Sequence, residues 1–149
     1  MRTPNYKKPR GGKPPYNNPP SIDLREIKLD KIKADLFSRV AEQTAETINA
    51  GRPKNKPTQL RKFYDEIVMW ETRISASPNS FDSFKESLPF IQMINAKVAY
   101  AKGRKLVDDN YLKLMHHCLD QVDSPETMRN FKLFIEAFMG FYKVKRPKD

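Results

Sequence analysis

Side chains that could carry out chemistry are sparse in this sequence. His116, His117 and Cys118 follow one another directly, and no second cysteine or suitably spaced histidine accompanies them. Neighbours on a helix point about 100° apart, so these three are poorly placed to bind one metal ion. Asp108 and Asp109 are more typical of a helix N-cap than of a divalent-ion site. We therefore expect no metal, no cofactor and no catalytic residues, in a protein that is not an enzyme.

Positive charge is the stronger signal. The chain has 149 residues, with 28 lysines and arginines against 18 acidic residues, and a formal net charge of +10. Basic domains commonly bind polyanions, most often nucleic acid; an anionic membrane surface is the other candidate. No hydrophobic run is long enough to span a bilayer, and no signal-peptide core follows the start. The single cysteine excludes an internal disulfide, so we expect a reduced, cytoplasmic setting.

Four cations crowd the expected start of a helix that begins near Thr58. The helix dipole makes cations mildly unfavourable at such an end, whereas a phosphate would meet both the cations and free backbone N–H groups. This pattern favours an anion site over a structural device, with a solubilising patch as the alternative. The four residues are Lys54, Lys56, Arg61 and Lys62.

A second basic segment lies on a later helix. At 100° per residue, Lys97, Tyr100 and Arg104 share one flank beside an apolar stripe, and Tyr100 could stack on a base. Continuing this helix unchanged would point Lys105 into the apolar stripe, so we expect Gly103 to end or loosen it. An edge of the hydrophobic core is the alternative interpretation of this flank.

Apolar residues recur at steps of three and four from Ser21 onward, and strand-like alternation is weak. The pattern predicts an all-α fold, a compact bundle of about five to six helices. We expect helices along the apolar row from Leu29 to Ile48 before Gly51, from a Thr58 N-cap, over 81–88, from Pro89 in a first turn, after Asp108 or Asp109, and from Ser124-Pro125.

Residues 1–20 differ from the rest. They contain six prolines, two glycines and five cations, with no acidic residue. This composition predicts a disordered, partly polyproline-like tail, with residues 21–149 forming the helical domain. The tail supplies half of the net charge and leaves the domain at +5. Tyr6 and Tyr16 could stack on bases, and a solvated arm without fixed contacts is the alternative.

The segments Thr58–Tyr64, Leu88–Ile91 and Lys97–Arg104, in this order and spacing, resemble one protein family. It is the small, all-helical subunit of type III-A CRISPR effector complexes, the Csm complexes. The resemblance spans about residues 30–145. It implies a non-catalytic subunit in antiviral defence, whose copies stack head to tail as an inner filament. The filament runs beside the backbone subunits that hold the CRISPR guide RNA, and together they form a channel for the guide–target RNA duplex.

Target-RNA cleavage belongs, by the same resemblance, to the backbone subunit, and DNA cleavage and cyclic oligoadenylate synthesis to the large subunit. The resemblance carries over Arg61, Lys97, Arg104 and Lys105 as RNA-facing residues. Lys54, Lys56 and Lys62 rest on the pattern of residues alone, as does Tyr100. The main alternative is a free-standing basic helical RNA- or DNA-binding protein. A helical adaptor for an acidic protein comes next, and an enzyme comes last.

Overall fold

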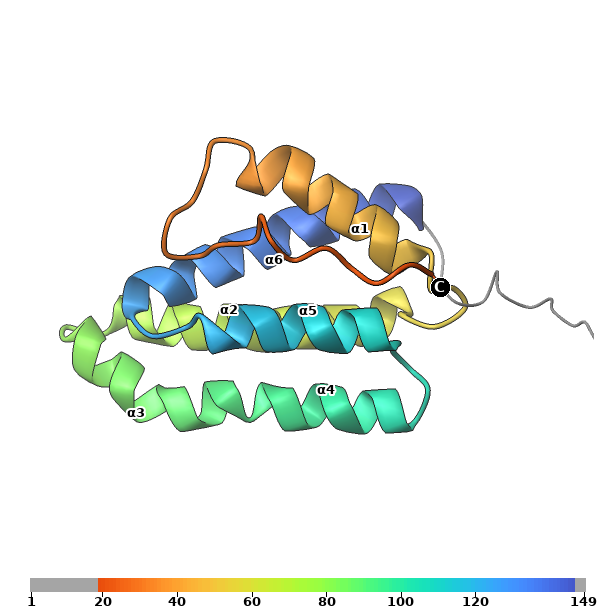
Figure 1. Ribbon diagram of the computed structural model, residues 1–149. Helices are drawn as coiled ribbons and strands as arrows, with labels where there is room; N and C mark the ends of the chain where they lie inside the picture. Colours follow the sequence, from red (N-terminus) through yellow and green to blue (C-terminus); the bar gives the residue numbers. More distant parts are fainter. Residues whose placement is uncertain (1–18, 147–149) are drawn as a thin grey trace, which may run out of the picture.

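The computed structural model describes residues 19–146, and all regular structure in that range is helical (Figure 1). The predicted all-α bundle is confirmed. Tyr6, Tyr16 and almost all of the predicted tail lie outside the described residues. A π-helical turn precedes six α-helices: η3 (Leu36–Val40), α1 (Ala41–Asn49), α2 (Pro57–Ala76), α3 (Ser80–Gln92), α4 (Ile94–Gly103), α5 (Asp109–Asp120) and α6 (Pro125–Lys145).

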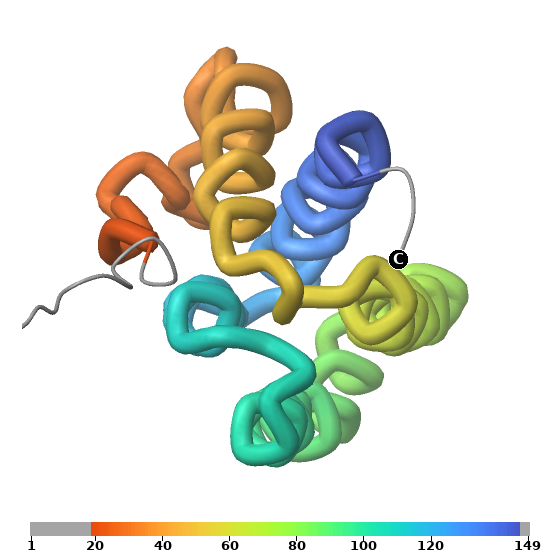
Figure 2. The backbone as a smooth tube through the Cα atoms, turned by 90° about the vertical axis from the view of Figure 1, so that its right-hand side faces the viewer, coloured from red at the N-terminus to blue at the C-terminus, as the bar shows by residue number. Residues whose placement is uncertain are grey.

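The helices pack in layers around α6. This helix contacts α1 and α2, while α2 contacts α3 and α4 contacts α5. In the end-on view, α4 lies on one side of the α2–α5 layer, and α1 and α6 lie on the other (Figure 2). The aromatic series of α6 supplies much of the core, since Phe131, Phe134, Phe138 and Tyr142 are all buried. Phe134 therefore faces the interior of the bundle.

Two predicted caps are confirmed. The Asp108 carboxylate accepts a hydrogen bond from the backbone N–H of Tyr111 at 3.0 Å and so begins α5. Ser124 accepts the N–H of Thr127 at 3.1 Å, and the Thr127 hydroxyl oxygen accepts the N–H of Ser124 at 3.0 Å. This reciprocal capping box satisfies donors that the first turn of α6 would otherwise leave without partners.

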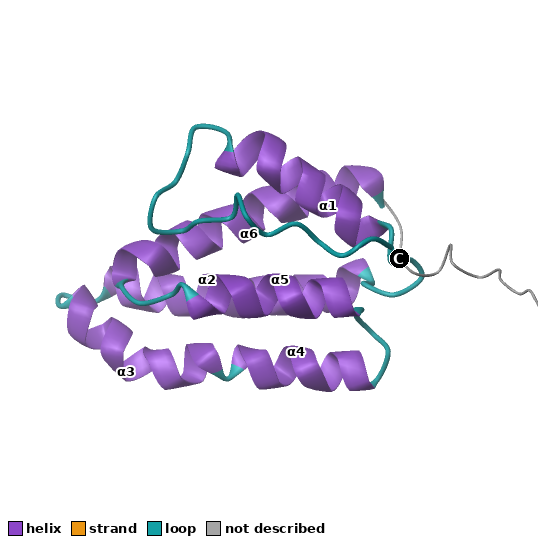
Figure 3. Ribbon diagram, in the orientation of Figure 1, coloured by secondary structure: helices purple, strands orange, loops and turns teal. Residues whose placement is uncertain are grey.

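The predicted helix over Leu29 to Ile48 is wrong over residues 29–35. Residues 19–35 form an irregular segment, which we call the strap, and helical structure begins only at η3 (Figure 3). Leu29 is buried within the strap, but Ile32 is 46% exposed and belongs to no buried row. The strap can stay non-helical because two side chains satisfy its backbone hydrogen-bonding groups. Gln121, which follows α5, accepts the Leu29 N–H, and Asn130 of α6 donates to the Leu29 carbonyl.

Two helix starts also differ from the prediction. Pro57 occupies the first turn of α2, so Lys56 rather than Thr58 is the N-cap residue, and it provides no side-chain cap hydrogen bond. Pro89 lies inside α3 instead of opening a new helix, and α4 starts only after Met93. The proline is tolerated because Pro89 and Lys85 are both exposed, so water can hydrate the Lys85 carbonyl that lacks a donor.

Candidate nucleic-acid interface

Positive charge gathers at one end of the bundle. The α1–α2 connection, the start of α2 and the end of α4 meet there, at the end that faces the viewer in Figure 2. Six exposed cations at this end form no ion pair with any residue in the range 19–146. We call this set the basic end: Arg52, Lys54, Lys56, Lys62, Arg104 and Lys105. Unpaired cations on one surface favour an anionic partner.

A first groove, of about 540 Å³, lies between α2 and α4. It brings together Lys62, Lys97, Tyr100 and Arg104, so the flank predicted from helical spacing is present and joins a cation from another helix. The Arg104 guanidinium lies 5.8 Å from the centre of the Tyr100 ring, and Tyr100 is 69% exposed. An exposed ring beside a cation can accept a stacked base next to a phosphate.

Lys97 is engaged within the protein. Its Nζ lies 3.0 Å from both carboxylate oxygens of Glu66, which also accepts a 3.2 Å hydrogen bond from the Trp70 indole. This pair joins α4 to α2 across the first groove and neutralises the lysine charge. Lys62 and Arg104 therefore supply the unpaired charge of this groove.

A second groove, of about 800 Å³, lies where the α1–α2 connection meets the α4–α5 connection. Lys54 and Lys105, which are 51 positions apart in sequence, both line it. Arg52, Lys102 and Lys113 also line it and were missed by the sequence interpretation. Lys102 and Lys113 lie 4.0 Å and 3.1 Å from the same Asp109 carboxylate. The sequence does contain a signal that could have identified Arg52, because this residue shares a short connection with Lys54.

Arg61 faces elsewhere. It lines a third groove, of about 630 Å³, between α2 and α6, together with Tyr64 and Lys143. Its guanidinium pairs with Asp65 one turn along at 3.2 Å, in an exposed contact of modest strength. Arg61 and Arg104, which the resemblance places together as RNA-facing, therefore line different grooves of the molecule.

Asn55 fixes the connection that carries Arg52, Lys54 and Lys56. It is fully buried, and its backbone is left-handed, with φ 61°. Its side chain donates to the Ile48 carbonyl at 2.9 Å and accepts from the Asp108 N–H at 2.8 Å. Its own N–H donates to the Leu106 carbonyl at 2.9 Å. One residue thus joins the end of α1, the α4–α5 connection and the loop between α1 and α2.

Arg146, at the end of α6, also holds the connection between α1 and α2. This residue is almost fully buried, and its guanidinium donates to the carbonyls of Pro53 at 3.0 Å and Lys54 at 2.6 Å. The Tyr142 hydroxyl donates to the Asn55 carbonyl at 2.6 Å. The backbone that carries the Lys54 side chain is therefore held in place by hydrogen bonds from Tyr142 and Arg146.

Lys105 lies just after α4 in a conformation that glycine usually adopts. Its φ is 64°, its N–H bonds the Lys102 carbonyl at 2.9 Å, and the N–H of Leu106 bonds the Ala101 carbonyl at 2.9 Å. This pair of bonds is a Schellman motif. The predicted end of the helix at Gly103 is confirmed, but Lys105 rather than the glycine takes the left-handed position.

Other kinds of site find no support in the range 19–146. No group of three or more His, Cys, Asp and Glu side chains there could hold a metal ion. Cys118 is buried in the core, and burial raises the pKa of its thiol well above the usual range, which keeps it protonated and unreactive. Among the described helices, none is both long enough and apolar enough to cross a bilayer.

Comparison with known proteins supports the resemblance noted in the sequence. The family model described as Csm2 Type III-A matches residues 31–148. The chain belongs to this family. It is accordingly a subunit of a type III-A CRISPR Csm complex. No curated protein and no solved structure matches the chain. The match covers all six α-helices and the basic end, and leaves residues 1–30 outside.

Proposed function

We propose that this Csm2-family chain is a non-catalytic subunit that holds the guide–target RNA through its basic end. The partners are the CRISPR guide RNA, the target RNA, and the backbone and large subunits of the Csm complex. Copies of the chain associate with one another in an inner filament that stabilises the assembly. The observation that carries the proposal is the basic end itself, six exposed cations without internal ion-pair partners among the described residues.

The chemistry of these residues suits contact with a nucleic-acid backbone. Lysine and arginine bind phosphate oxygens, and such contacts position a duplex without reading its sequence. That property fits a complex in which pairing with the guide RNA supplies the specificity. Each copy can bind weakly, because several copies acting on one duplex raise the overall affinity.

Charge reversal at the second groove tests this proposal. In the assembled complex, Lys54→Glu with Lys105→Glu should weaken RNA retention. The slope of log affinity against log salt should fall by about one unit for each phosphate that a copy no longer neutralises. The matched control reverses Lys31 and Lys33, two exposed lysines of the strap. RNA retention that responds equally to both double variants, or to neither, would overturn the proposal.

Measurement of the isolated chain separates this function from its main alternative. A subunit that acts by avidity should bind RNA weakly alone and strongly within the complex. Strong, salt-sensitive RNA binding by the purified chain would instead indicate a free-standing nucleic-acid-binding protein. Competition by an acidic peptide but not by RNA would indicate an adaptor for an acidic protein.

A further inference from the structure

We propose that the first groove, between α2 and α4, binds one unpaired base of the RNA. The base stacks on the Tyr100 ring, while Lys62 and Arg104 hold the phosphates next to it. This role rests on the proposed function and deepens it, because it assigns to one groove a contact with a base in addition to the RNA backbone. It depends on the exposure of the ring, on the free charge around it and on the lining of the groove.

Tyr100 presents an aromatic ring to solvent at the first groove. Its side chain is 69% exposed, and its hydroxyl forms no hydrogen bond with any residue in the range 19–146. Ile94, Val98 and Ala101 are the buried residues of α4 and form its contact with the core. Tyr100 is therefore not an edge of the core, and an exposed aromatic face is a surface on which a base can stack.

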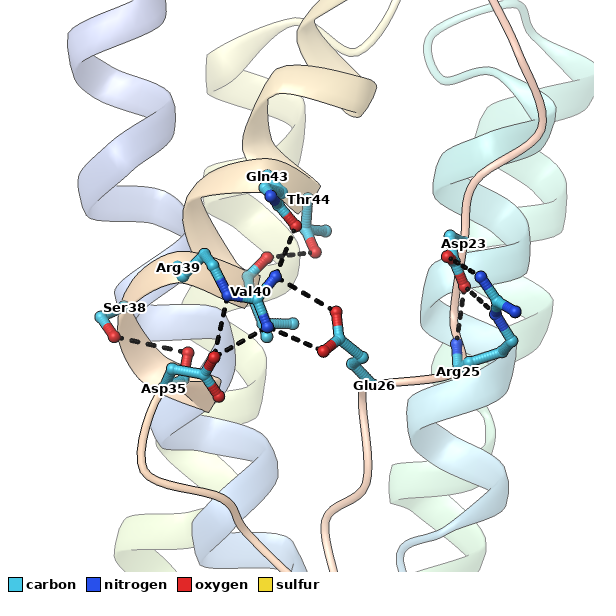
Figure 4. Close-up of polar contacts among 9 residues, drawn as sticks. All are labelled: Asp23, Arg25, Glu26, Asp35, Ser38, Arg39, Val40, Gln43 and Thr44. Atoms are coloured by element: carbon cyan, nitrogen blue, oxygen red, sulfur yellow. Dashed lines mark hydrogen bonds and ion pairs between the residues drawn. The ribbon is translucent and has the colours of Figure 1, made fainter.

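Two cations without a carboxylate partner lie around this ring. The Arg104 guanidinium is 5.8 Å from the centre of the Tyr100 ring, and Lys62 reaches the same groove from α2. Neither forms an ion pair within the described part of the chain. The Arg39 guanidinium, in contrast, lies 2.7 Å from each of the two carboxylates that it pairs with (Figure 4). Lys62 and Arg104 therefore remain available for the phosphates of a nucleotide.

The lining of the first groove suits a base. Its volume of about 540 Å³ falls within the usual range of about 300–1,000 Å³ for small-molecule sites. Met93, which is half exposed, and Ala96 provide apolar surface, and the Gln59 amide can both donate and accept a hydrogen bond at a base edge. Glu66 is the single acidic residue among the described residues that line the groove, and Lys97 neutralises it at 3.0 Å. No free carboxylate of this lining therefore repels a phosphate.

This arrangement selects a base that has left the duplex. Inside a continuous RNA helix, the neighbouring bases cover both faces of each base, so an aromatic side chain stacks only on a base that is splayed out. The second groove differs, because the described residues that line it are rich in cations and include no aromatic ring. We therefore assign backbone phosphates to the second groove, and a base with its adjacent phosphates to the first.

Removal of the ring in the assembled complex tests this assignment. Tyr100→Ala should lower the affinity for target RNA by about 5- to 100-fold, the usual effect of losing one stacked base. The slope of log affinity against log salt should stay the same, because no charge is removed. Tyr100→Phe keeps the ring and should retain the affinity. The matched control is Phe81→Ala: Phe81 is 57% exposed with the Lys85 ammonium 5.5 Å from its ring centre, but it does not line the first groove.

Nuclear magnetic resonance of the purified full chain distinguishes a base from a phosphate as the ligand. The probes are a single-stranded uridine oligonucleotide, an RNA duplex of the same length and inorganic phosphate. A stacked base should move the ring-proton signals of Tyr100 upfield with the single strand alone, and Tyr100→Phe identifies those signals. An equal shift with the duplex or with inorganic phosphate would overturn the assignment of an unpaired base.

The outcomes separate this assignment from the proposed function. Loss of RNA retention on reversing Lys54 and Lys105, with no effect of Tyr100→Ala, would overturn the base site and leave the proposed function standing. No effect of either change would overturn both. An equal loss of affinity for Tyr100→Ala and Phe81→Ala, or for Tyr100→Ala and Tyr100→Phe, would also overturn the base site, because binding would then not depend on a ring in this groove.

Discussion

Lys105 combines a charge at the proposed RNA-binding surface with an unfavourable backbone conformation. A side chain in the left-handed region costs about 1 kcal/mol relative to glycine, because Cβ approaches the following carbonyl. Sequences usually place glycine at this position of a Schellman motif, and here Gly103 lies only two residues away. A lysine at this strained position is compatible with the proposed contact between its charge and RNA phosphates.

Substitution at Lys105 should therefore separate stability from RNA binding. We expect Lys105→Gly to raise the free energy of unfolding by about 1 kcal/mol, measured by urea denaturation, while RNA retention by the complex weakens. Lys105→Asn, which tolerates the same backbone conformation, should also weaken RNA retention. A glycine variant that is no more stable than the unchanged chain would contradict this account.

Gly51 is required by close packing rather than by its backbone angles. A Cβ at this position would overlap the Asp108 carboxylate and lie 2.8 Å from the Asn55 amide nitrogen. Gly51→Ala should lower the free energy of unfolding by about 1–3 kcal/mol, because the Asp108 cap and Asn55 must shift together. Gly103→Ala is the matched control: its Cβ would meet nothing within 4 Å, so the helix should gain about 0.5–1 kcal/mol. Equal thermal shifts for the two variants would count against this explanation.

Arg104 and Arg61 should differ in their effect on RNA retention. Arg104 lies in the first groove beside Tyr100, whereas Arg61 is paired with Asp65 in another groove. We therefore expect Arg104→Glu to weaken RNA retention by the complex more than Arg61→Glu does, with unchanged helical content by circular dichroism. A larger effect of Arg61→Glu would show that the α2–α6 groove faces the RNA.

At the scale of elements, the end of α6 supports the connection between α1 and α2. Arg146 is buried without a carboxylate partner in the range 19–146, and its charge is met by backbone carbonyls of Pro53, Lys54 and Asn55. Removing the guanidinium takes away the donor that these carbonyls share. The helix that forms the centre of the core therefore also supports the backbone that carries Arg52, Lys54 and Lys56.

Arg146→Ala should release this connection. We expect the free energy of unfolding to fall by about 2 kcal/mol, and amide hydrogen exchange over residues 52–56 to become faster. Arg146→Lys keeps the charge but lacks the planar guanidinium that reaches several carbonyls. The stability of this variant should therefore lie between that of the unchanged chain and that of Arg146→Ala. Unchanged exchange over residues 52–56 in the alanine variant would contradict this role.

Local signals in the sequence were sufficient for some elements and not for others. The Asp108 and Ser124 caps were predicted because each acts on a backbone group three residues away. The strap was missed because its backbone partners, Gln121 and Asn130, lie about a hundred residues further along the chain. The Lys97–Glu66 ion pair was not predicted for a similar reason, because its members belong to different helices. Helical spacing predicted the flank of Tyr100 and Arg104, but only the packing of α2 beside α4 adds Lys62.

At the scale of the whole molecule, the core holds several groups that resist ionisation. Burial raises the pKa of Tyr111, of Cys118 and of Tyr142 above their ordinary values. The folded chain therefore binds more protons than the unfolded chain in alkaline solution. The stability that this provides is fully present below the unfolded pKa values, about 8.5 for cysteine and about 10 for tyrosine, and is lost as the pH rises above them.

Alkaline pH should therefore destabilise the fold in steps. Between about pH 8.5 and 10, the free energy of unfolding should fall by up to about 1.4 kcal/mol per pH unit, because Cys118 ionises only in the unfolded chain. Urea denaturation at intervals from about pH 7 to 10 measures this slope. Cys118→Ala should flatten it in that range. A slope that persists in the alanine variant would assign the effect to other groups.

The strap has a further consequence for the order in which the chain folds. Its bonds to Asn110 and Asn130 join residues 88 and 101 positions apart, so the part of the described fold that is synthesised first completes its contacts last. At about 5–20 residues per second, a ribosome takes about 5–20 s to pass from Leu29 to Asn130. Throughout that interval the apolar side chains of Ile27 and Leu29 lack their final burial site. The pace of translation therefore sets how long these side chains stay unburied. This segment is also the first part of the described fold that a chaperone on the nascent chain would meet.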